Sequence, residues 1–544
     1  MATVNINRNQ FEKEIGKIDE KMEERISMLG TPIEKLTKEE LQIEIYPNRP
    51  DLLSYHGFKR AFLAFIDKKT GLQKYKIEKS DYKVFVDSSL KDIRPYTACA
   101  VVKNLKFDSE KIKEIIEIQE KLHMTIGRKR KKLAIGIYPM DKIKFPITFK
   151  ALEPDKIKFM PLDSDREMSG LEILQRHPTG KEYAPLLAGK AKFPIFIDSN
   201  KNILSMPPII NSHQTGKVTE KTKDIFIECS GFDLNTLNKC LNILVSTLAD
   251  MGGSIHEIEV DYGKEKKISP SFESEKMGIN IENVNKLLGL TLKESEIKKL
   301  LERMGYDYNK NNVEIPSWRV DILHEVDLIE DIAIAYGYEN FMPEIPKIAT
   351  IGNEDPKETV KRKISDILTG LNIQEVSNYH LTTKKDQFEK MNTKESEYIE
   401  VENSKTDYNT LRTNLAHYLM KNFSENVDND FPQRIFEIGR VFKLKDNVSE
   451  KENIAVAISP GNFTELKQIL NYLFKMMELN VKFEEPKEIP DYLIQGRVAS
   501  ILLKEKEIGF LGEVHPKVLK NWKVRMPVAL FEISFDKIYE ELKS

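Results

Sequence analysis

The 544-residue chain is predicted to be a multidomain α+β protein. Its length corresponds to about three or four domains of roughly 150 residues. Residues 268–345 place two helical stretches, short strands and a final helix in an order typical of a winged helix. Residues 350–544 alternate strand-like runs, turns and helices, which predicts a mostly antiparallel sheet. There is no internal repeat.

Composition limits the possible partners and compartments. Lys and Arg number 84 and Asp and Glu number 86, a net charge of −2 that excludes a polybasic binder but allows a local basic patch. The three cysteines, Cys99, Cys229 and Cys240, lack zinc-ligand spacing and predict a reducing compartment. No apolar run approaches about 18 residues and the N-terminus has no hydrophobic signal core. We therefore expect a cytoplasmic protein with no membrane partner.

Residues 1–75 predict a small N-terminal α/β domain. Strands are expected at residues 3–6 and 41–45, with an amphipathic stretch at 9–18. Pro47 and Pro50 exclude helix or central strand at residues 46–51. A helical pattern begins after Asp51, which is a candidate N-cap. The charged residues 76–92 predict a linker or an edge strand.

Residues 90–265 predict one α+β domain. Strands are expected at 94–102, 133–138, 193–198 and 225–229, and helices at 110–124 and 234–251. Five consecutive basic residues, 128–132, form either a solvated loop or a contact for a phosphate backbone. The proline-broken segment 204–212 carries hydroxyl and amide groups at intervals.

Acidic residues gather at the end of the 268–345 segment. Asp327, Glu330 and Asp331 are spaced to share one face of a helix, where three like charges repel. A Mg²⁺ ion would remove that repulsion, and Asp321 just before the helix would supply a fourth oxygen. Alternatively, the acidic residues only complement the helix dipole and hold no metal.

Other enzyme signatures are absent from the sequence. There is no GxxxxGK[ST], GxSxG or HExxH motif, and the nine histidines are scattered. In residues 350–544, strands are expected at 398–401, 435–442, 499–503, 507–511 and 528–534. Helices are expected there at 358–371, 414–426 and 463–479.

Residues 319–321 (RVD) and 327–338 (DLIEDIAIAYGY) resemble the beta subunit of phenylalanyl-tRNA synthetases in its archaeal and eukaryotic-cytosolic form. Further matches follow in the family's order along the chain: YPNRPDLL at 46–53, GRKRKK at 127–132, SMPPIINS at 205–212, RIFEIGRVF at 434–442 and GFLGEVHP at 509–516. The resemblance spans nearly the whole chain.

The resemblance implies a heterotetramer of two alpha and two beta chains that attaches phenylalanine to its tRNA with ATP. The alpha chain then holds the aminoacylation site, and residues 350–544 form a class II synthetase-like antiparallel sheet core without activity. The family binds Mg²⁺ in the winged-helix-like domain, in a site shared with the alpha chain. The matching positions here are Asp321, Asp327, Glu330 and Asp331, and Asp331 stands where many members have Glu.

Residues 90–265 resemble the family's editing-type α/β domain, which hydrolyses tyrosine wrongly attached to the phenylalanine tRNA. The candidates are Ser205, Asn211, Glu228 and Ser230. Glu228 would accept the tyrosine hydroxyl, and the other three would hold the ester or a water molecule. Alternatively, all four are ordinary loop or strand-end residues.

This chain departs from the family's pattern within the editing-type domain. Asp and Thr are frequent in the family where Glu228 and Ser230 stand. Tyr138-Pro139 replaces the more usual His-Asp.

A second hypothesis is a freestanding RNA-binding adaptor with a degenerate synthetase-like core. Such an adaptor would use residues 128–132 and the winged helix to bind RNA. The two hypotheses differ in whether the chain requires a catalytic partner.

Overall fold

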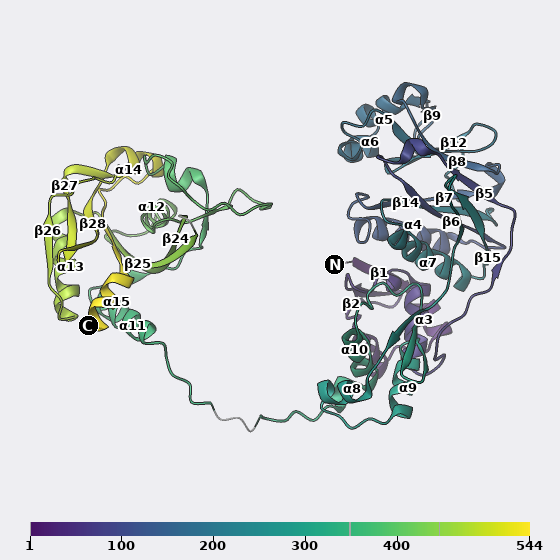
Figure 1. The fold of residues 1–544 in the computed structure, drawn as a ribbon, viewed down its shortest axis with the longest axis horizontal. Coiled ribbons are helices and arrows are strands. Elements are labelled where there is room, and N and C mark those ends of the chain that lie inside the picture. Colours follow the sequence, from purple (N-terminus) through teal and green to yellow (C-terminus); the bar gives the residue numbers. More distant parts are fainter. Residues whose placement is uncertain (1, 347–349, 445–446, 544) are drawn as a thin grey trace. The chain divides into compact units, whose positions relative to one another are not determined.

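The computed structural model describes residues 2–346, 350–444 and 447–543. Residues 1–345 form one compact unit and residues 346–544 another (Figure 1). Met1 and Ser544, the outer ends of the first and last predicted domains, lie outside the described residues. The finer division of the first unit at residues 75 and 265 stays a prediction. Among the described helices, none is long and apolar enough to cross a membrane.

The first unit begins with a three-stranded antiparallel sheet, in the order β1-β3-β2, and a helix that packs on it. Its elements are β1 (Ala2–Asn7), α1 (Arg8–Glu14), α2 (Glu20–Met28), β2 (Ile33–Leu36), β3 (Glu40–Ile45) and α3 (Tyr55–Phe65). The predicted strands at 3–6 and 41–45 are confirmed.

The prediction that Asp51 caps α3 is wrong. Pro50–Leu52 forms a separate 3₁₀ turn, so the helix starts later and Ser54 is its N-cap, accepting from the Gly57 N–H at 3.0 Å. Asp51 is buried and accepts two hydrogen bonds of 2.9 Å from the Arg49 guanidinium. A buried carboxylate needs such a partner.

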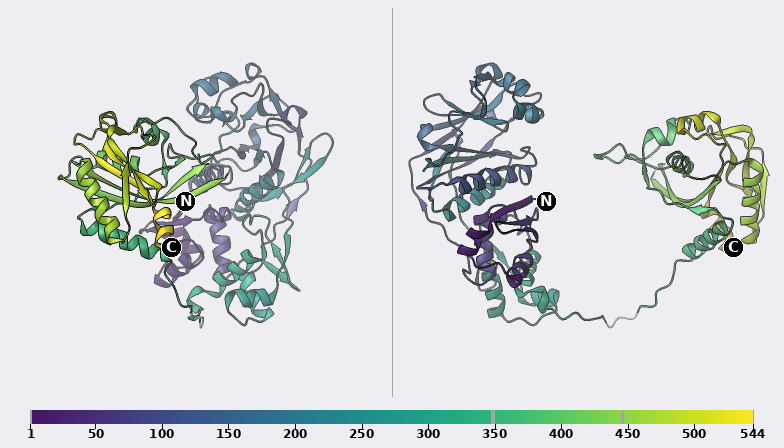
Figure 2. Two further views of the ribbon diagram at one scale, coloured as in Figure 1. Left: turned by 60° about the vertical axis from the view of Figure 1, so that its left-hand side comes forward. Right: turned by 180° about the vertical axis from the view of Figure 1, so that it is seen from behind.

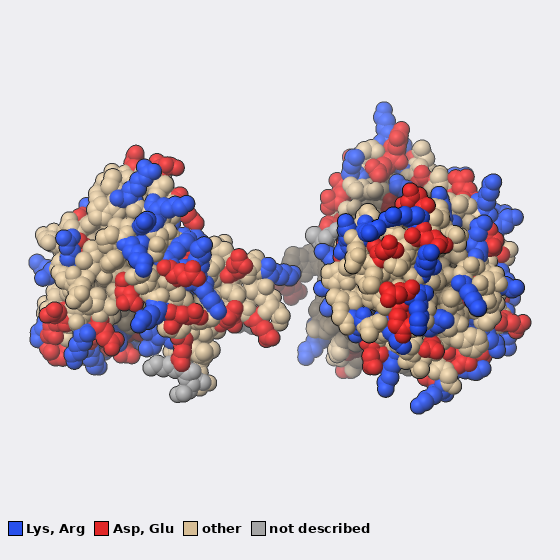
Figure 3. All heavy atoms as spheres, turned by 90° about the horizontal axis from the view of Figure 1, so that it is seen from above, with Lys and Arg blue, Asp and Glu red and all other residues tan. Residues whose placement is uncertain are grey.

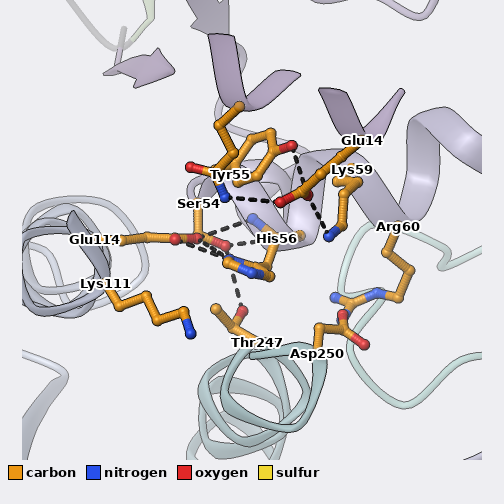
Figure 4. Close-up of polar contacts among 12 residues, drawn as sticks. Glu14, Ser54, Tyr55, His56, Lys59, Arg60, Lys111, Glu114, Thr247 and Asp250 are labelled. Atoms are coloured by element: carbon orange, nitrogen blue, oxygen red, sulfur yellow. Dashed lines mark hydrogen bonds and ion pairs between the residues drawn. The ribbon is translucent and has the colours of Figure 1, made fainter. Parts of the chain in front are cut away.

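Polar contacts fasten α3 to two helices of the following segment (Figure 4). His56 Nδ1 lies 2.8 Å from Glu114 Oε2 on α4 (Ser109–Met124). One turn further on, Arg60 Nη1 donates to Asp250 Oδ2 at 2.5 Å, at the end of α7 (Leu234–Asp250). Apolar residues of α3, α4 and α7 also belong to one continuous core. Residues 1–75 therefore share one hydrophobic core with the segment that follows.

Two larger sheets pack face to face in the rest of this unit. The first has five strands: β4 (Ile77–Glu78), β15 (Ser254–His256), β6 (Tyr96–Lys103), β14 (Ile225–Gly231) and β7 (Leu133–Pro139), in that order. The second has seven strands: β13 (Ile210–Asn211), β12 (Ile203–Met206), β11 (Phe193–Ile197), β8 (Ile147–Leu152), β5 (Lys83–Val86), β16 (Ile258–Asp261) and β17 (Lys266–Ser269), in that order.

Alternating side chains of the five-stranded sheet serve two cores. On one face, residues such as Ile135 and Ile227 pack against α4 and α7. On the other face, Tyr138 and Phe226 pack against residues such as Phe149 of the seven-stranded sheet. This alternation is what a strand buried on both sides requires. Two short helices and a two-stranded sheet cover one end: α5 (Gly170–Arg176), α6 (Pro178–Tyr183), β9 (Lys158–Phe159) and β10 (Met168–Ser169).

The interpretation of residues 76–92 as a linker or an edge strand is right for β4, which is an edge of the five-stranded sheet, but wrong for the rest of the segment. Residues 76–92 also contain β5, which lies between β8 and β16 inside the seven-stranded sheet. Only one of its side chains, Val84, is fully buried, so the alternation is too short to recognise among the charged neighbours.

The last part of the first unit combines a three-stranded sheet, in the order β18-β20-β19, with three helices. Its elements are β18 (Glu275–Gly278), α8 (Ile281–Leu288), α9 (Glu294–Arg303), β19 (Asp307–Asn309), β20 (Asn312–Ile315) and α10 (Glu325–Tyr336). Asn280 caps α8 by accepting from the backbone N–H of Glu282 and Asn283, and Gly289 ends it in a left-handed conformation. The predicted order of elements is confirmed.

The second unit is a seven-stranded sheet with helices on both faces (Figures 1 and 2). The strands, in spatial order, are β21 (Gln374–Glu375), β24 (Gln433–Leu444), β25 (Val448–Ser459), β29 (Ala529–Ser534), β28 (Lys506–Val514), β27 (Leu493–Leu503) and β26 (Val481–Glu484). Except for β21, each pairs antiparallel with its neighbours, as predicted.

Two separate cores hold these helices. One face carries α11 (Pro356–Gly370), α13 (Phe463–Met476) and α15 (Phe535–Lys543). The other carries α12 (Ala416–Glu425) and α14 (Pro516–Trp522). A two-stranded sheet, β22 (Leu381–Thr382) and β23 (Thr410–Leu411), and a π-helical turn, Lys385–Glu389, complete the unit.

One strand prediction for this unit is wrong, and one central strand was not predicted. Residues 398–401 form no strand, and only an isolated bridge joins Glu400 to Thr410. The central strand β25 has no predicted counterpart, because its first half is polar and only its second half is buried. On the visible face of each unit, acidic and basic side chains are interspersed, in keeping with the net charge of −2 (Figure 3).

We predict that Asp250→Ala destabilises the first unit by about 3 kcal/mol, the usual cost of breaking a mostly buried ion pair. Arg60 is 11% exposed and would lose its carboxylate partner, while the Tyr75 hydroxyl would lose its acceptor. Denaturant unfolding of the full chain measures the change. The control is Lys74→Ala, because Lys74 is 77% exposed in its pair with Asp307 and should matter by less than about 0.5 kcal/mol. Equal stability of the two variants would show that the Arg60–Asp250 pair does not help to hold α3 in place.

Candidate functional site

A cavity of 430 Å³ lies where edge strands of the two large sheets meet, beside α4. β7 is the edge of the five-stranded sheet and β13 that of the seven-stranded sheet. Apolar residues dominate the wall, among them Ile112, Ile115, Ile135, Ile137 and Ile209. The main polar groups are Gln119, Glu120, His123, Arg130, His177, Asn211 and Glu228. An apolar cavity with a few convergent polar groups is the usual form of a binding site.

Glu228 is the buried acid of this cavity. It lies on β14 directly across from Gly136 of β7 and is 1% exposed. Its Oε2 atom is buried and has no hydrogen-bond partner among the described residues. A Cβ atom at position 136 would lie 2.6 Å from Glu228 Oε1, so only glycine leaves room for the carboxyl group beside the edge strand.

Burial raises the pKa of Glu228 to about 8, although the nearby Arg94 guanidinium acts in the opposite direction. The carboxyl group is therefore mostly protonated at neutral pH. A neutral carboxyl group both donates and accepts hydrogen bonds, whereas a carboxylate only accepts.

Tyr138 links the two sheets behind Glu228. Its hydroxyl donates to Ser205 Oγ on β12 at 2.7 Å and lies 3.3 Å from Glu228 Oε1. Its ring is fully buried and stacks on Phe226 with centroids 5.8 Å apart. The Tyr138 departure noted in the sequence thus has a physical role, which is to hold one oxygen of Glu228.

The structure separates the four predicted editing residues into two pairs. Asn211 and Glu228 line the cavity. Ser205 is 1% exposed and accepts from Tyr138, and Ser230 is fully buried and accepts from Arg94 Nε at 3.1 Å. Neither serine lines the cavity, so both support the buried acid from behind.

The basic run 128–132 forms a tight turn at the cavity. Arg128, Lys129 and Arg130 have φ values of 46°, 55° and 61°, three successive left-handed residues without a glycine. Each such residue costs roughly 1–2 kcal/mol, and such strain tends to persist at functional sites. Arg128, Lys129, Lys131 and Lys132 are exposed.

Arg130 differs from its neighbours because it belongs to the cavity wall. It donates to Glu120 Oε1 and to the Ile209 carbonyl, both at 2.9 Å, and lies 4.5 Å from the centre of the Tyr183 ring. The interpretation of the whole run as a solvated loop is therefore wrong for Arg130.

Two histidines line the cavity, and sequence reasoning singled out neither. His123 Nε2 accepts from the Ile135 N–H at 2.8 Å, while its Nδ1 faces Glu120 at 3.2 Å. His177 Nε2 lies 3.1 Å from the Leu162 carbonyl, and its Nδ1 is buried without a partner among the described residues. His177 and Glu228 share the cavity but stand far apart in the sequence, so no local motif could reveal their association.

Two of the predicted metal ligands pair with an arginine. Arg319 Nε and Nη2 donate to the two oxygens of Asp321 at 2.8 and 2.7 Å, and Nη2 also donates to Asp331 Oδ2 at 2.8 Å. The Tyr306 hydroxyl donates to the same oxygen of Asp331. Burial alone would raise the pKa of Asp321, but Arg319 outweighs it and lowers that pKa. Both acids thus serve as ion-pair partners of Arg319.

The other two acids point elsewhere. Asp327 Oδ2 accepts from the backbone N–H of Leu323 and His324, both at 2.8 Å, and so caps α10. Glu330 is exposed, whereas Asp331 is 5% exposed. The prediction of one shared acidic face is therefore wrong, because adjacent helix positions diverge by about 100° and Arg319 draws Asp331 inward.

These positions do not fit a Mg²⁺ ion held by this chain alone. Two of the carboxylates neutralise Arg319, a third caps a helix, and only Glu330 is exposed. Within the described ranges, no group of three or more His, Cys, Asp or Glu side chains is arranged to hold a metal.

The second unit buries a charged pair beneath its sheet. Arg412, 1% exposed, donates through Nη1 to Glu437 Oε1 at 2.6 Å. Asn378 Nδ2 donates to the other oxygen of Glu437 at 2.7 Å. Arg412 also donates through Nε to the Arg440 carbonyl at 2.7 Å, so backbone and side-chain acceptors together hold it in place.

Three segments of the chain match known family profiles. Residues 95–244 match the B3/4 domain, residues 277–338 the tRNA synthetase B5 domain, and residues 342–535 the phenylalanyl tRNA synthetase beta chain CLM domain.

Relatives cover nearly the whole chain. The phenylalanine–tRNA ligase beta subunit of Thermococcus sibiricus is 41% identical over 504 residues, covering 91% of this chain and 90% of the relative. That of Archaeoglobus fulgidus is 38% identical over 550 residues, covering 99% of each. The crystal structure of an N-terminal fragment of the phenylalanyl-tRNA synthetase beta subunit from Pyrococcus horikoshii is similar in fold, with 37% identity and a TM-score of 0.59. It aligns with 61% of this chain and 99% of the fragment. The chain therefore belongs to the family of phenylalanine–tRNA ligase beta subunits and forms part of that aminoacyl-tRNA ligase.

Proposed function

We propose that this beta subunit hydrolyses tyrosine wrongly attached to the phenylalanine tRNA, in the cavity of 430 Å³ between the two sheets. One observation carries the proposal: a buried acid, Glu228, lines the cavity with one oxygen lacking any partner among the described residues. A polar atom left unpaired in an apolar cavity is costly unless a ligand satisfies it.

The chemistry of the two amino acids explains why such a site is useful. Tyrosine is phenylalanine plus a hydroxyl, and an apolar synthesis pocket rejects an added hydroxyl only by about 10²-fold. A second site that hydrogen-bonds the hydroxyl prefers tyrosine, because phenylalanine would leave Glu228 unpaired there. The neutral Glu228 carboxyl group can both donate to and accept from a phenol. Asn211 supplies an amide for the ester end of the substrate.

The turn at residues 128–132 supports delivery of the tRNA end to this cavity. Its four exposed basic residues adjoin Arg130 of the wall. Phosphate contacts of this kind position a nucleic acid without reading its sequence. The near-neutral net charge of the chain is compatible with such a confined patch.

The predicted domains outside the cavity fit a supporting role in the ligase. A beta subunit of such a ligase acts with an alpha subunit and a tRNA. We assign residues 1–75 to an N-terminal α/β domain, residues 90–265 to an editing-type domain, residues 268–345 to a winged-helix-like domain and residues 350–544 to an inactive class II-like core. ATP is then used at the alpha chain, in a complex of two alpha and two beta chains.

A Mg²⁺ ion shared with the alpha chain stays a prediction. Of the four candidate acids, Glu330 and the half-buried Asp327 remain to reach such an ion. The hydrolysis of Tyr-tRNA in the cavity does not depend on it.

We predict that Glu228→Ala or Asn211→Ala slows hydrolysis of Tyr-tRNA at least tenfold and leaves phenylalanine attachment unchanged. Either change removes a polar contact made only with the misacylated substrate. Deacylation and aminoacylation assays of the chain co-expressed with its alpha subunit measure both rates. Glu220→Ala, at an exposed position outside the cavity lining, is the control. Wild-type deacylation in both cavity variants would refute the site.

A second prediction concerns stability and pH. The unfolded chain ionises Glu228 near its ordinary pKa of 4.5, whereas the folded chain keeps it protonated up to about pH 8. The unfolded state therefore binds fewer protons in this window, and the stability contributed by Glu228 is full below pH 4.5 and falls as the pH rises to 8. Across about three pH units the loss is on the order of 4 kcal/mol.

Glu228→Gln should abolish this loss while keeping the shape of the side chain. Thermal melts of wild type and variant at about pH 5 and about pH 8 measure the effect, and the difference between the two proteins isolates the one carboxyl group. Melting curves that shift in parallel with pH would contradict the buried protonated acid.

A third prediction concerns the basic turn. Replacing Arg128 and Lys129 by Ala should weaken binding of the phenylalanine tRNA and reduce the slope of log affinity against log salt by about 0.7–0.9 for each lost contact. Binding titrations of the assembled ligase at several salt concentrations give this slope. Lys201 and Lys310 are matched controls, since both are exposed lysines with positive φ. If Ala at the control positions weakened tRNA binding equally, the effect of the turn would be only that of positive charge in general.

A further inference from the structure

His177 is a second polar residue of the cavity with an unpaired buried atom. It lies between α5 and α6, is 7% exposed and lines the cavity. Its backbone N–H donates to the Ile173 carbonyl at 3.1 Å, and its own carbonyl accepts from Lys181 at 2.9 Å. The two short helices therefore fix the position of the imidazole ring.

The hydrogen bonds of the ring determine its tautomer. Nε2 lies 3.1 Å from the Leu162 carbonyl, which can only accept, so Nε2 carries the hydrogen. In the neutral ring, Nδ1 then carries the lone pair. That atom is buried and has no partner within the part of the chain that the structure describes. The Leu162 carbonyl also stabilises the imidazolium that forms when Nδ1 takes a proton.

The other titratable groups of the cavity are less suited to accept a proton. His123 uses both ring nitrogens, toward Ile135 and Glu120. Glu120 also accepts from Arg130. Glu228 is already protonated at neutral pH, and Asp163 and Lys217 are exposed to solvent, which weakens their role.

We propose that His177 Nδ1 is the general base of the hydrolysis, an inference that rests on the proposed editing function. Nδ1 takes a proton from a water molecule as the water oxygen forms a bond to the ester carbonyl carbon. The bond between that carbon and the ribose oxygen then breaks, and the proton passes from the imidazolium to the ribose oxygen. The products are free tyrosine and tRNA, and His177 returns to its neutral form. No other reactant is consumed.

The test is His177→Gln in the ligase assembled with its alpha subunit, with Tyr-tRNA as the substrate. Glutamine keeps an N–H that can donate to the Leu162 carbonyl but has no basic nitrogen. Single-turnover deacylation should slow by about 10²–10⁴-fold, the usual contribution of a general base, while KM and aminoacylation stay unchanged.

His213→Gln is the matched control. His213 likewise has a buried Nδ1 without a partner among the described residues, but it does not line the cavity. Its replacement should leave deacylation unchanged.

Each outcome decides one of the two proposals. A wild-type ligase that does not deacylate Tyr-tRNA refutes the editing function itself. A wild-type ligase that does so, with His177→Gln equally fast or affected only in KM, overturns the role of His177 alone. If His177→Gln does not assemble, His177→Ala with added imidazole decides: recovery that rises with imidazole concentration supports the base, and no recovery overturns it.

Discussion

The face-to-face packing of the five-stranded and seven-stranded sheets is the constraint on which the rest of the first unit depends. It places Tyr138 between Ser205 and Glu228, which come from different strands far apart in the chain. It also brings the two sheet edges together where the cavity lies. A carboxyl group can stay in this apolar layer only because one oxygen meets a hydroxyl and the proton remains bound. The sheet packing therefore controls both the shape and the protonation of the candidate site.

In the last part of the first unit, acidic side chains are neutralised by an arginine and not by a bound proton. There the carboxylates Asp321 and Asp331 both bind Arg319 as ion-pair partners. A buried pair of this kind is weak support for stability, but removing one partner leaves an uncompensated charge. A cluster of acids that looks in the sequence like a metal site is thus, within this chain, mainly an arginine site. The identity of the cationic partner decides the role of the acids.

Sequence reasoning recovers the elements whose periodicity is carried by buried side chains. The helices α4 and α7 and the strands β7 and β14 are predictable for that reason. It fails where burial is partial, as in β5 and β25, because half of each strand reads as polar.

The residues of the candidate site also differ in whether the sequence alone could identify them. Glu228 and Asn211 are identified through family resemblance and both line the cavity, whereas the geometry moves Ser205 and Ser230 behind it. His177 has no informative sequence neighbours, since its significance comes from an unpaired nitrogen that only the folded chain reveals. The spacing of acids on α10 is correct, but spacing cannot show that Arg319 folds back onto Asp331.

The bonds of Arg130 to the Pro208 and Ile209 carbonyls join the basic turn to the apolar lip of the cavity. The proposed contact with RNA and the shape of the cavity therefore depend on the same segment of backbone. Changes at Arg130 and at residues of the lip would not act independently, because they alter a common contact. If the two proposed roles hold, a substitution at Arg130 that changes affinity for the nucleic acid also changes the shape of the cavity wall.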